Sequence, residues 1–273
     1  MNKTTAIAIG GFDGMHIAHQ ALFQELGENG TIVVIETGHA NLTPDGFRER
    51  HSNYPIVYFQ LDDIRHLDGE EFIALLKRKF PMLKKIVVGY DFHFGKGRRY
   101  SYDDLKKLFN GDVVVVEEVK HNNDAIHSHK IRAKLKIGDI KGANEFLGYN
   151  YTIVGERVDG QGLGSKELFA TINLHVKDFL LPKEGVYVTV TRVDNEEHFH
   201  PSVSFIGHRI TTDGSFAVET HILDGAVTCK EKAEISFVDF IRNNEKFDTL
   251  LQLKEAIKKD IAIASKELKF LQL

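Results

Sequence analysis

Residues 5–19 read TAIAIGGFDGMHIAH, and this stretch carries the pattern from which the fold is predicted. The short apolar run 5–9 is typical of a buried strand, and it ends at two glycines, Gly10 and Gly11. From Ile17 onward the apolar residues are spaced as in a helix. A strand, a glycine turn and a helix in this order predict the start of a parallel α/β sheet, with a ligand site where the strand ends.

The same alternation continues to about residue 150. Expected strands occur at 31–35, 85–88 and 112–117, and helical patterns occur at 17–26, 70–79 and 103–109. Strands that alternate with helices imply a parallel sheet with crossover connections. Ligands of such sheets lie beyond the carboxyl ends of the strands, so the loops after residues 9, 35, 89 and 119 are the places to search.

The periodicity changes at about residue 151. Closely spaced β-rich runs separated by glycine and proline follow at 185–192, 202–207, 215–223 and 232–241, and they predict a small antiparallel barrel. The tail 249–268 has apolar residues three or four apart, so we expect an amphipathic helix laid against that barrel. Helical turns at 134–148 lead to a predicted domain boundary near residue 150.

Composition excludes several classes of function. The formal net charge is −4 and the basic residues are spread along the chain, so we expect no nucleic-acid surface. The single cysteine, Cys229, cannot form an internal disulfide, which is typical of the cytoplasm. No apolar run is long enough to cross a bilayer. We therefore expect a cytoplasmic protein that acts on small molecules without a membrane partner; an oligomer is neither excluded nor predicted.

His16 and His19 lie one turn apart at the expected start of the first helix. Free N–H groups and the positive dipole end attract anions there, and both imidazoles can face one phosphate group. An isolated H-x-x-H pair would ordinarily be two histidines on a half-exposed helix. The position after a strand and two glycines favours phosphate binding instead. A zinc site would need further ligands, and the sequence has neither a cysteine cluster nor an H-E-x-x-H run.

The run FDGMHIAH at 12–19 resembles F-D-G-V-H-x-G-H, a signature of the adenylyltransferase half of the bacterial FAD synthetase family, with Ala18 in place of the second glycine. The resemblance implies that His16 and His19 are catalytic and stabilise charge on the α-phosphate and the departing pyrophosphate. It also implies ATP contacts along the turn, at Gly11, Phe12, Asp13 and Gly14.

Two further segments of the first half resemble the same family. Residues 89–98 resemble G-x-D-F-x-F-G-x-G-R, which implies flavin contacts at Asp91, Phe92, Phe94 and Arg98. The two aromatics could stack on an isoalloxazine, although without the resemblance they would be simple loop anchors. Residues 126–132 match I-S-S-T-x-I-R in part, with His127 and His129 replacing small hydroxyl residues. The implied ATP contacts are Ser128 and Arg132, the latter as a bidentate phosphate ligand. The loop around His39 is either a polar turn or a substrate contact.

A second candidate site follows the glycine-rich run 155–164. Thr171 and Asn173 lie two apart on an extended chain, so they point to one face. Their hydroxyl and amide oxygens can hold Mg²⁺ and orient phosphate oxygens, although this spacing is also common on exposed strands. The segment resembles the family's G-x-L-G-F-P-T-A-N. The resemblance implies metal ligands at Thr171 and Asn173 and ATP contacts at Gly160 and Gly164. The departures from it are Ser165, Glu167, Leu168 and Ala170.

Glu219 is the candidate general base of this second site. It is an acid in an otherwise apolar strand, where burial would raise its pKa toward a value useful for proton transfer. On an edge strand it would be an ordinary surface carboxylate. Residues 182–187 and 205–211 also resemble the family, as P-x-x-G-V-Y and N-I-G-x-R-P-T.

The resemblances run in order from Phe12 to Ala264. They imply a Rossmann-like nucleotidyltransferase domain over 1–150 and a riboflavin kinase-like barrel with a terminal helix over 151–273. The implied function is phosphorylation of riboflavin to FMN by ATP, then adenylylation of FMN to FAD with release of pyrophosphate, each step needing Mg²⁺. Glu219 would take the proton of the ribityl 5′-hydroxyl. Two other hypotheses stay open: an FMN adenylyltransferase with a degenerate kinase domain, and a non-enzymatic flavin-binding protein.

Overall fold

The structure is a computed structural model that describes residues 3–159, 169–194, 196–225 and 227–269. It divides into two compact units, residues 1–128 and 129–273, and each is described by itself. None of the helices within the described ranges is long and apolar enough to cross a membrane.

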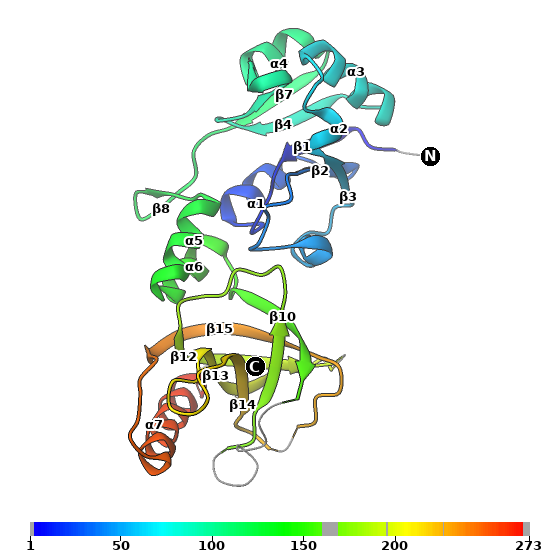
Figure 1. Ribbon diagram of the computed structural model, residues 1–273. Coiled ribbons are helices and arrows are strands. Elements are labelled where there is room, and N and C mark those ends of the chain that lie inside the picture. The colour runs from blue at the N-terminus through cyan, green and yellow to red at the C-terminus, as the bar shows by residue number, and fades with distance from the viewer. Residues whose placement is uncertain (1–2, 160–168, 195, 226, 270–273) are drawn as a thin grey trace. The chain divides into compact units, whose positions relative to one another are not determined.

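The first unit is built on a five-stranded parallel sheet (Figure 1). The strand order is β3 (Ile56–Gln60), β2 (Gly30–Glu36), β1 (Ala6–Gly10), β4 (Lys85–Gly89) and β7 (Asp112–Val116). From β1 the chain adds strands outward on one side and then returns to add β4 and β7 on the other. The reversal places a topological switch point between β1 and β4, where open α/β sheets bind their ligands.

Helices cover both faces of this sheet. On one face α1 (Ile17–Gln24) packs through Leu22 and Phe23 onto a core that includes Ala8 and Val34. On the other face α3 (Gly69–Lys79) and α4 (Tyr102–Leu108) pack onto a second core that includes Ile9 and Val88. Shorter elements complete the unit: η1 (Asp45–His51), α2 (Leu61–Ile64), β5 (His93–Phe94), η2 (Lys96–Arg98), β6 (Tyr100–Ser101), β8 (Lys120–His121) and β9 (Asp124–Ala125).

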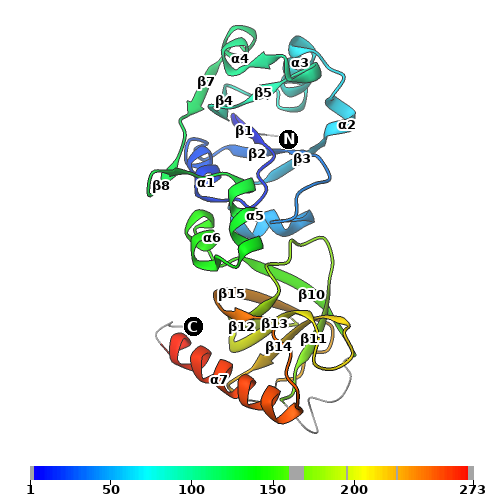
Figure 2. The same cartoon turned by 60° about the vertical axis from the view of Figure 1, so that its left-hand side comes forward.

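The second unit is a closed six-stranded antiparallel barrel with helices beside it (Figure 2). The order around the barrel is β10 (Thr152–Val158), β11 (Ile172–Val176), β14 (Phe216–Ile222), β13 (His200–His208), β12 (Gly185–Val193) and β15 (Lys232–Asn243). The terminal helix α7 (Leu250–Leu268) packs against β12 and β13 through Ala264 and Leu268. Helix α5 (Ser128–Ile137) precedes α6 (Ile140–Leu147), which packs against β15.

The predicted fold class is confirmed: a parallel α/β unit is followed by an antiparallel barrel with a terminal helix. The compact units meet at residues 128 and 129, earlier than the predicted boundary near residue 150. The segment between these positions holds α5 and α6. The limits 1–150 and 151–273 concern the functional domains and stay a prediction.

Candidate active sites

The turn after β1 has an unusual backbone. Phe12 and Met15 have φ angles of 46° and 39°, and Gly14 has a φ of 86°. A Cβ at Gly10 would lie 2.9 Å from the ring of Phe12, so a side chain there would collide with the turn. The ring of Phe12 lies so close to Gly10 that only glycine fits at the end of this strand without a shift of the ring.

Asp13 holds this turn to the loop that follows β2. Its buried carboxylate accepts hydrogen bonds from the backbone N–H groups of Asn41, Leu42 and Thr43 at 3.3, 3.1 and 3.0 Å. The Ser128 hydroxyl donates to the Asp13 carbonyl oxygen at 2.7 Å. The side chains of both predicted ATP-binding residues thus serve to fix the loops around the turn. A nucleotide contact at these residues stays a prediction.

His16 and His19 form a stacked pair at the start of α1. Their ring centroids are 3.5 Å apart with an interplanar angle of 18°. His16 is buried and caps the helix, because its Nδ1 accepts the backbone N–H of His19 at 3.4 Å. His19 is partly exposed, and its Nδ1 is shielded from solvent and has no hydrogen-bond partner within the described part of the chain. The structure therefore brings the two predicted catalytic histidines together.

The surroundings of His19 oppose a positive charge on its ring. Burial, followed by the nearby His16, Arg48 and His127, holds the pKa of His19 well below its ordinary value of 6.5. At neutral pH the imidazole is uncharged and donates one N–H. It can approach an anion as a hydrogen-bond donor, and a phosphate beside it would favour its protonated form.

Arg48, which the sequence analysis missed, lies beside the same turn. Its side chain is buried, pairs with Glu36 at 2.9 Å and donates to the Gly11 carbonyl oxygen at 3.4 Å. Its guanidinium carbon also lies 5.8 Å from the centre of the Tyr58 ring. Arg48 belongs to the short 3₁₀ segment η1, which carries no recognisable motif. The sequence pointed to Arg48 only through its position, as a positively charged residue in the segment that follows the second strand.

The predicted flavin residues lie after β4 and differ in exposure. Phe94 is buried in the core and packs against Phe72 and Tyr100, with ring centroids 5.6 and 5.5 Å away. Phe92 is partly buried and stacks on Phe94 at 5.6 Å. Asp91 and Arg98 are exposed. Phe94 is thus a loop anchor, whereas Phe92 and the two charged residues keep accessible surface for a ligand.

Arg132, the last of the predicted ATP contacts, lies in the second turn of α5. Its side chain is partly exposed. The helix belongs to the second compact unit, while the histidine pair belongs to the first. A role for Arg132 in nucleotide binding stays a prediction.

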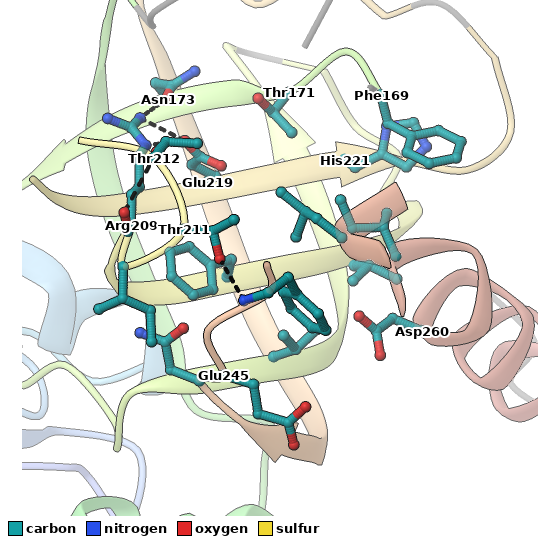
Figure 3. Close-up of a pocket in the computed structure, with 18 of the residues that line it drawn as sticks. Phe169, Thr171, Asn173, Arg209, Thr211, Thr212, Glu219, His221, Glu245 and Asp260 are labelled. Atoms are coloured by element: carbon teal, nitrogen blue, oxygen red, sulfur yellow. Dashed lines mark hydrogen bonds and ion pairs between the residues drawn. The ribbon is translucent and has the colours of Figure 1, made fainter. Parts of the chain in front are cut away.

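The second unit contains a cavity of about 520 Å³ that holds the predicted kinase residues (Figure 3). Its polar wall includes Thr171, Asn173, Arg209 and Glu219. Its apolar lining is formed by Val186, Val203, Phe205, Phe247, Leu253 and Ile257, and further charged side chains, among them Arg242, Glu245 and Asp260, also line it. A cavity of this size that combines apolar surface with convergent polar groups is typical of small-molecule sites.

Asn173 and Glu219 face each other across β11 and β14, where they are paired residues of the ladder. Arg209 joins them: Nη2 donates to Asn173 Oδ1 at 2.6 Å, and Nε donates to Glu219 Oε1 at 2.8 Å (Figure 3). Glu219 is partly buried, but its neighbour is a guanidinium rather than the apolar surroundings expected of its strand. The predicted base and one predicted metal ligand therefore share one cation.

Residues Phe169 and Ala170, which precede β11, contact His221 of β14. The His221 ring nitrogen Nδ1 lies 2.7 Å from the Ala170 carbonyl oxygen, and the ring packs against Phe169 at 5.3 Å. Thr171 follows directly and lines the cavity. The predicted ATP contacts Gly160 and Gly164 lie outside the described residues, as do three of the four departures from the family pattern, Ser165, Glu167 and Leu168.

Thr171 and Asn173 offer oxygen atoms of the kind that bind magnesium, although Asn173 Oδ1 already accepts a hydrogen bond from Arg209 Nη2, and their role as metal ligands stays a prediction. Mg²⁺ prefers oxygen ligands and commonly takes only one or two from the protein, with water and substrate phosphates supplying the rest. Within the described ranges no group of three or more histidine, cysteine or carboxylate side chains could hold a metal by itself. A hydroxyl and a carboxamide that line one cavity suit an ion that arrives with its nucleotide.

Comparison with known proteins matches a family model to part of each unit. The riboflavin kinase family model matches residues 147–268, and the FAD synthetase family model matches residues 53–130. A bifunctional riboflavin kinase/FMN adenylyltransferase of Listeria monocytogenes is 29% identical, with 93% of this chain and 89% of that protein aligned. The protein of that name from Escherichia coli K12 is 28% identical, over 93% of this chain and 90% of its own length.

A solved structure shares the fold over nearly the whole chain. It is a crystal structure named as a macrolide-efflux protein from Streptococcus pneumoniae, with a TM-score of 0.86 and 24% identity. The match covers 97% of this chain and 95% of that one. At this level of identity the likeness concerns the fold.

Proposed function

The chain belongs to the family of bifunctional riboflavin kinases and FMN adenylyltransferases, and we propose that its two sites carry out the two steps of FAD synthesis. Riboflavin is phosphorylated to FMN in the barrel domain, 151–273. FMN is then adenylylated to FAD in the N-terminal domain, 1–150. The observation that carries the proposal is that Thr171, Asn173 and Glu219 line one cavity together with a set of apolar side chains.

In the kinase step the apolar residues that line the cavity bind the flavin ring, and Glu219 accepts the proton of the ribityl 5′-hydroxyl. That oxygen attacks the γ-phosphorus of ATP, the bond from the γ-phosphorus to the bridging oxygen breaks, and ADP leaves. Thr171 and Asn173 would hold Mg²⁺, which would supply positive charge to the phosphate oxygens.

In the adenylyl step a phosphate oxygen of FMN attacks the α-phosphorus of ATP, and pyrophosphate leaves. His16 and His19 donate hydrogen bonds to the phosphates at the start of α1, where the backbone N–H groups add further donors. The turn 11–14 and Ser128 line the nucleotide site. Asp91, Phe92 and Arg98 contact the flavin, and Phe94 supports Phe92 from the core.

Two single substitutions test the assignment when each step is assayed separately. His19→Ala lowers FAD formation from FMN and ATP by about 100-fold or more, because it removes a donor to the reacting phosphates. It leaves FMN formation from riboflavin unchanged. Glu219→Ala does the reverse, lowering FMN formation by about 100-fold or more. Products are separated by chromatography.

The control is His66→Ala, which removes an exposed histidine of the N-terminal unit. Both rates stay at the wild-type value in this variant. Loss of both activities in either test variant would contradict two independent sites. Retention of both in both variants would remove the catalytic roles given to His19 and Glu219.

A further inference from the structure

Arg209 makes four side-chain hydrogen bonds in the kinase cavity and has no role in the proposed phosphoryl transfer. Its Nε and Nη2 both donate to the same oxygen of Glu219, Oε1. Nη2 also donates to Asn173 Oδ1 at 2.6 Å. Within the described part of the chain, the second carboxylate oxygen of Glu219 has no hydrogen-bond partner. The guanidinium of Arg209 therefore fixes Oε1 of the Glu219 carboxylate and leaves Oε2 available.

The guanidinium is itself held in place by the loop between β13 and β14. Nη1 donates to the Ser215 hydroxyl at 2.9 Å, and that hydroxyl donates to Asp213 Oδ1 at 2.8 Å. The backbone closes the same loop, because Arg209 N–H donates to the Ser215 carbonyl oxygen at 2.8 Å. A chain of contacts thus runs from Asp213 through Ser215 and Arg209 to Glu219. A long side chain restrained at both its backbone and its tip orients its partner precisely enough for proton transfer.

We propose that Arg209 is the positioning residue for Glu219 in the kinase step: it clamps one carboxylate oxygen so that the free one meets the 5′-hydroxyl of riboflavin. The inference rests on the proposed role of Glu219. A planar fork suits this work better than an ammonium group, since Nε and Nη2 reach the same oxygen from two directions. The contact to Asn173 sets the spacing between the base and the predicted metal ligand.

Kinetics of the full-length protein test the proposal. Arg209→Gln lowers kcat for FMN formation by about 100-fold, the cost of losing alignment at a reacting group, and leaves KM for riboflavin unchanged. Arg209→Lys restores part of the rate, because it keeps the charge without the fork. FAD formation from FMN, measured on the same samples, stays at the wild-type rate and reports that the N-terminal domain is intact.

Arg192→Gln is the matched control for the barrel. Arg192 pairs with Glu234 at 2.7 Å across neighbouring strands of the same barrel, and neither residue lines the cavity. This variant loses an arginine–glutamate pair and keeps its kinase rate. Ser215→Ala is a milder test that removes only the hydroxyl to which the guanidinium donates, and we expect it to lower kcat less than Arg209→Gln does. It serves as the test of the proposal if Arg209→Gln fails to fold.

A double-substitution cycle tests the positioning role of Arg209 separately from the proposed role of Glu219 as the base. If Arg209 acts through Glu219, the variant carrying Arg209→Gln and Glu219→Gln is no slower than Glu219→Gln alone. Losses that multiply, or a raised KM in Arg209→Gln, would overturn the positioning role and indicate direct contact with substrate. A wild-type kcat in both Arg209→Gln and Ser215→Ala would also overturn it. A fully active Glu219→Gln would instead refute Glu219 as the base, and the inference with it.

Discussion

His19 and His51 occupy partly buried positions of the N-terminal unit that disfavour their protonated forms. Burial, together with the cation of Arg50, lowers the pKa of His51 from 6.5 to about 4. Burial is also the largest cause of the lowered pKa of His19. Between pH 6.5 and the folded-state value, the unfolded chain binds a proton that the folded chain does not. The free energy of unfolding therefore decreases as the pH falls through this window.

A substitution at His51 tests this dependence. His51→Gln removes the titrating ring and keeps a polar side chain, so the variant loses less stability than the wild type when the pH falls from 7 to 5. Thermal unfolding followed by circular dichroism at both pH values measures the difference in Tm. His66→Ala, at an exposed histidine, keeps the wild-type loss. An equal decrease in Tm in wild type and His51→Gln would contradict the burial of this ring as its cause.

The sequence allowed prediction of the histidine pair but not of the cations that surround the sites. His16 and His19 were found because a strand, two glycines and a helix start place a helix terminus beside a turn, which is a local rule. Arg48 and Arg209 act across loops that are distant from their partners in sequence: Arg48 reaches Gly11, and Arg209 reaches Asn173. Arg209 falls on the arginine of the N-I-G-x-R-P-T pattern, but the contacts of both arginines depend on tertiary packing, which local spacing does not predict.

Between elements, the carboxylate of Asp13 is the link that holds the first turn to the segment 41–43. It is buried, and it accepts the N–H groups of three consecutive residues. Asp13→Ala leaves those donors without an acceptor, and we expect a loss of about 2 kcal/mol in the free energy of unfolding. Faster hydrogen exchange at the amides of residues 41–43 locates the effect. Asp13→Asn keeps one acceptor oxygen, so we expect its free energy of unfolding to lie between those of the wild type and Asp13→Ala.

The matched control for this change is Asp62→Ala. Asp62 is exposed and pairs with Arg65 one turn away, so its removal costs at most about 0.5 kcal/mol. Unchanged exchange at 41–43 in Asp13→Ala would contradict the role of the carboxylate as a link between the loops.

Element types were well predicted wherever the periodicity was strong. The central strands β1, β2 and β4, and the helices α3 and α7, lie within a few residues of their expected bounds. Strand β3, Ile56–Gln60, was missed although its sequence IVYFQ has four apolar residues, which are partly buried at the edge of the sheet, while Gln60 is exposed. Helices α5 and α6 were recognised as helical turns. Their membership of the second compact unit depends on tertiary packing, such as that of α6 against β15, which the pattern of either helix does not specify.

For the whole molecule, the change from alternating strands and helices to closely spaced strands was enough to predict two different folds. That distinction is robust because each periodicity reflects which faces of an element are buried. The boundary between the folds was less predictable, since helices can pack on either neighbour. The chemistry follows the same division: the histidine pair lies in the α/β unit, and the hydroxyl, carboxamide and carboxylate groups lie in the barrel.

The most direct test of FAD synthesis by this chain is the product balance of the purified protein supplied with riboflavin, ATP and Mg²⁺. We predict that FMN appears first and FAD follows, with one ADP and one pyrophosphate released for every FAD formed. Formation of FAD only when FMN is supplied would indicate an adenylyltransferase with an inactive barrel domain. Tight flavin binding with no consumption of ATP would contradict both proposed steps.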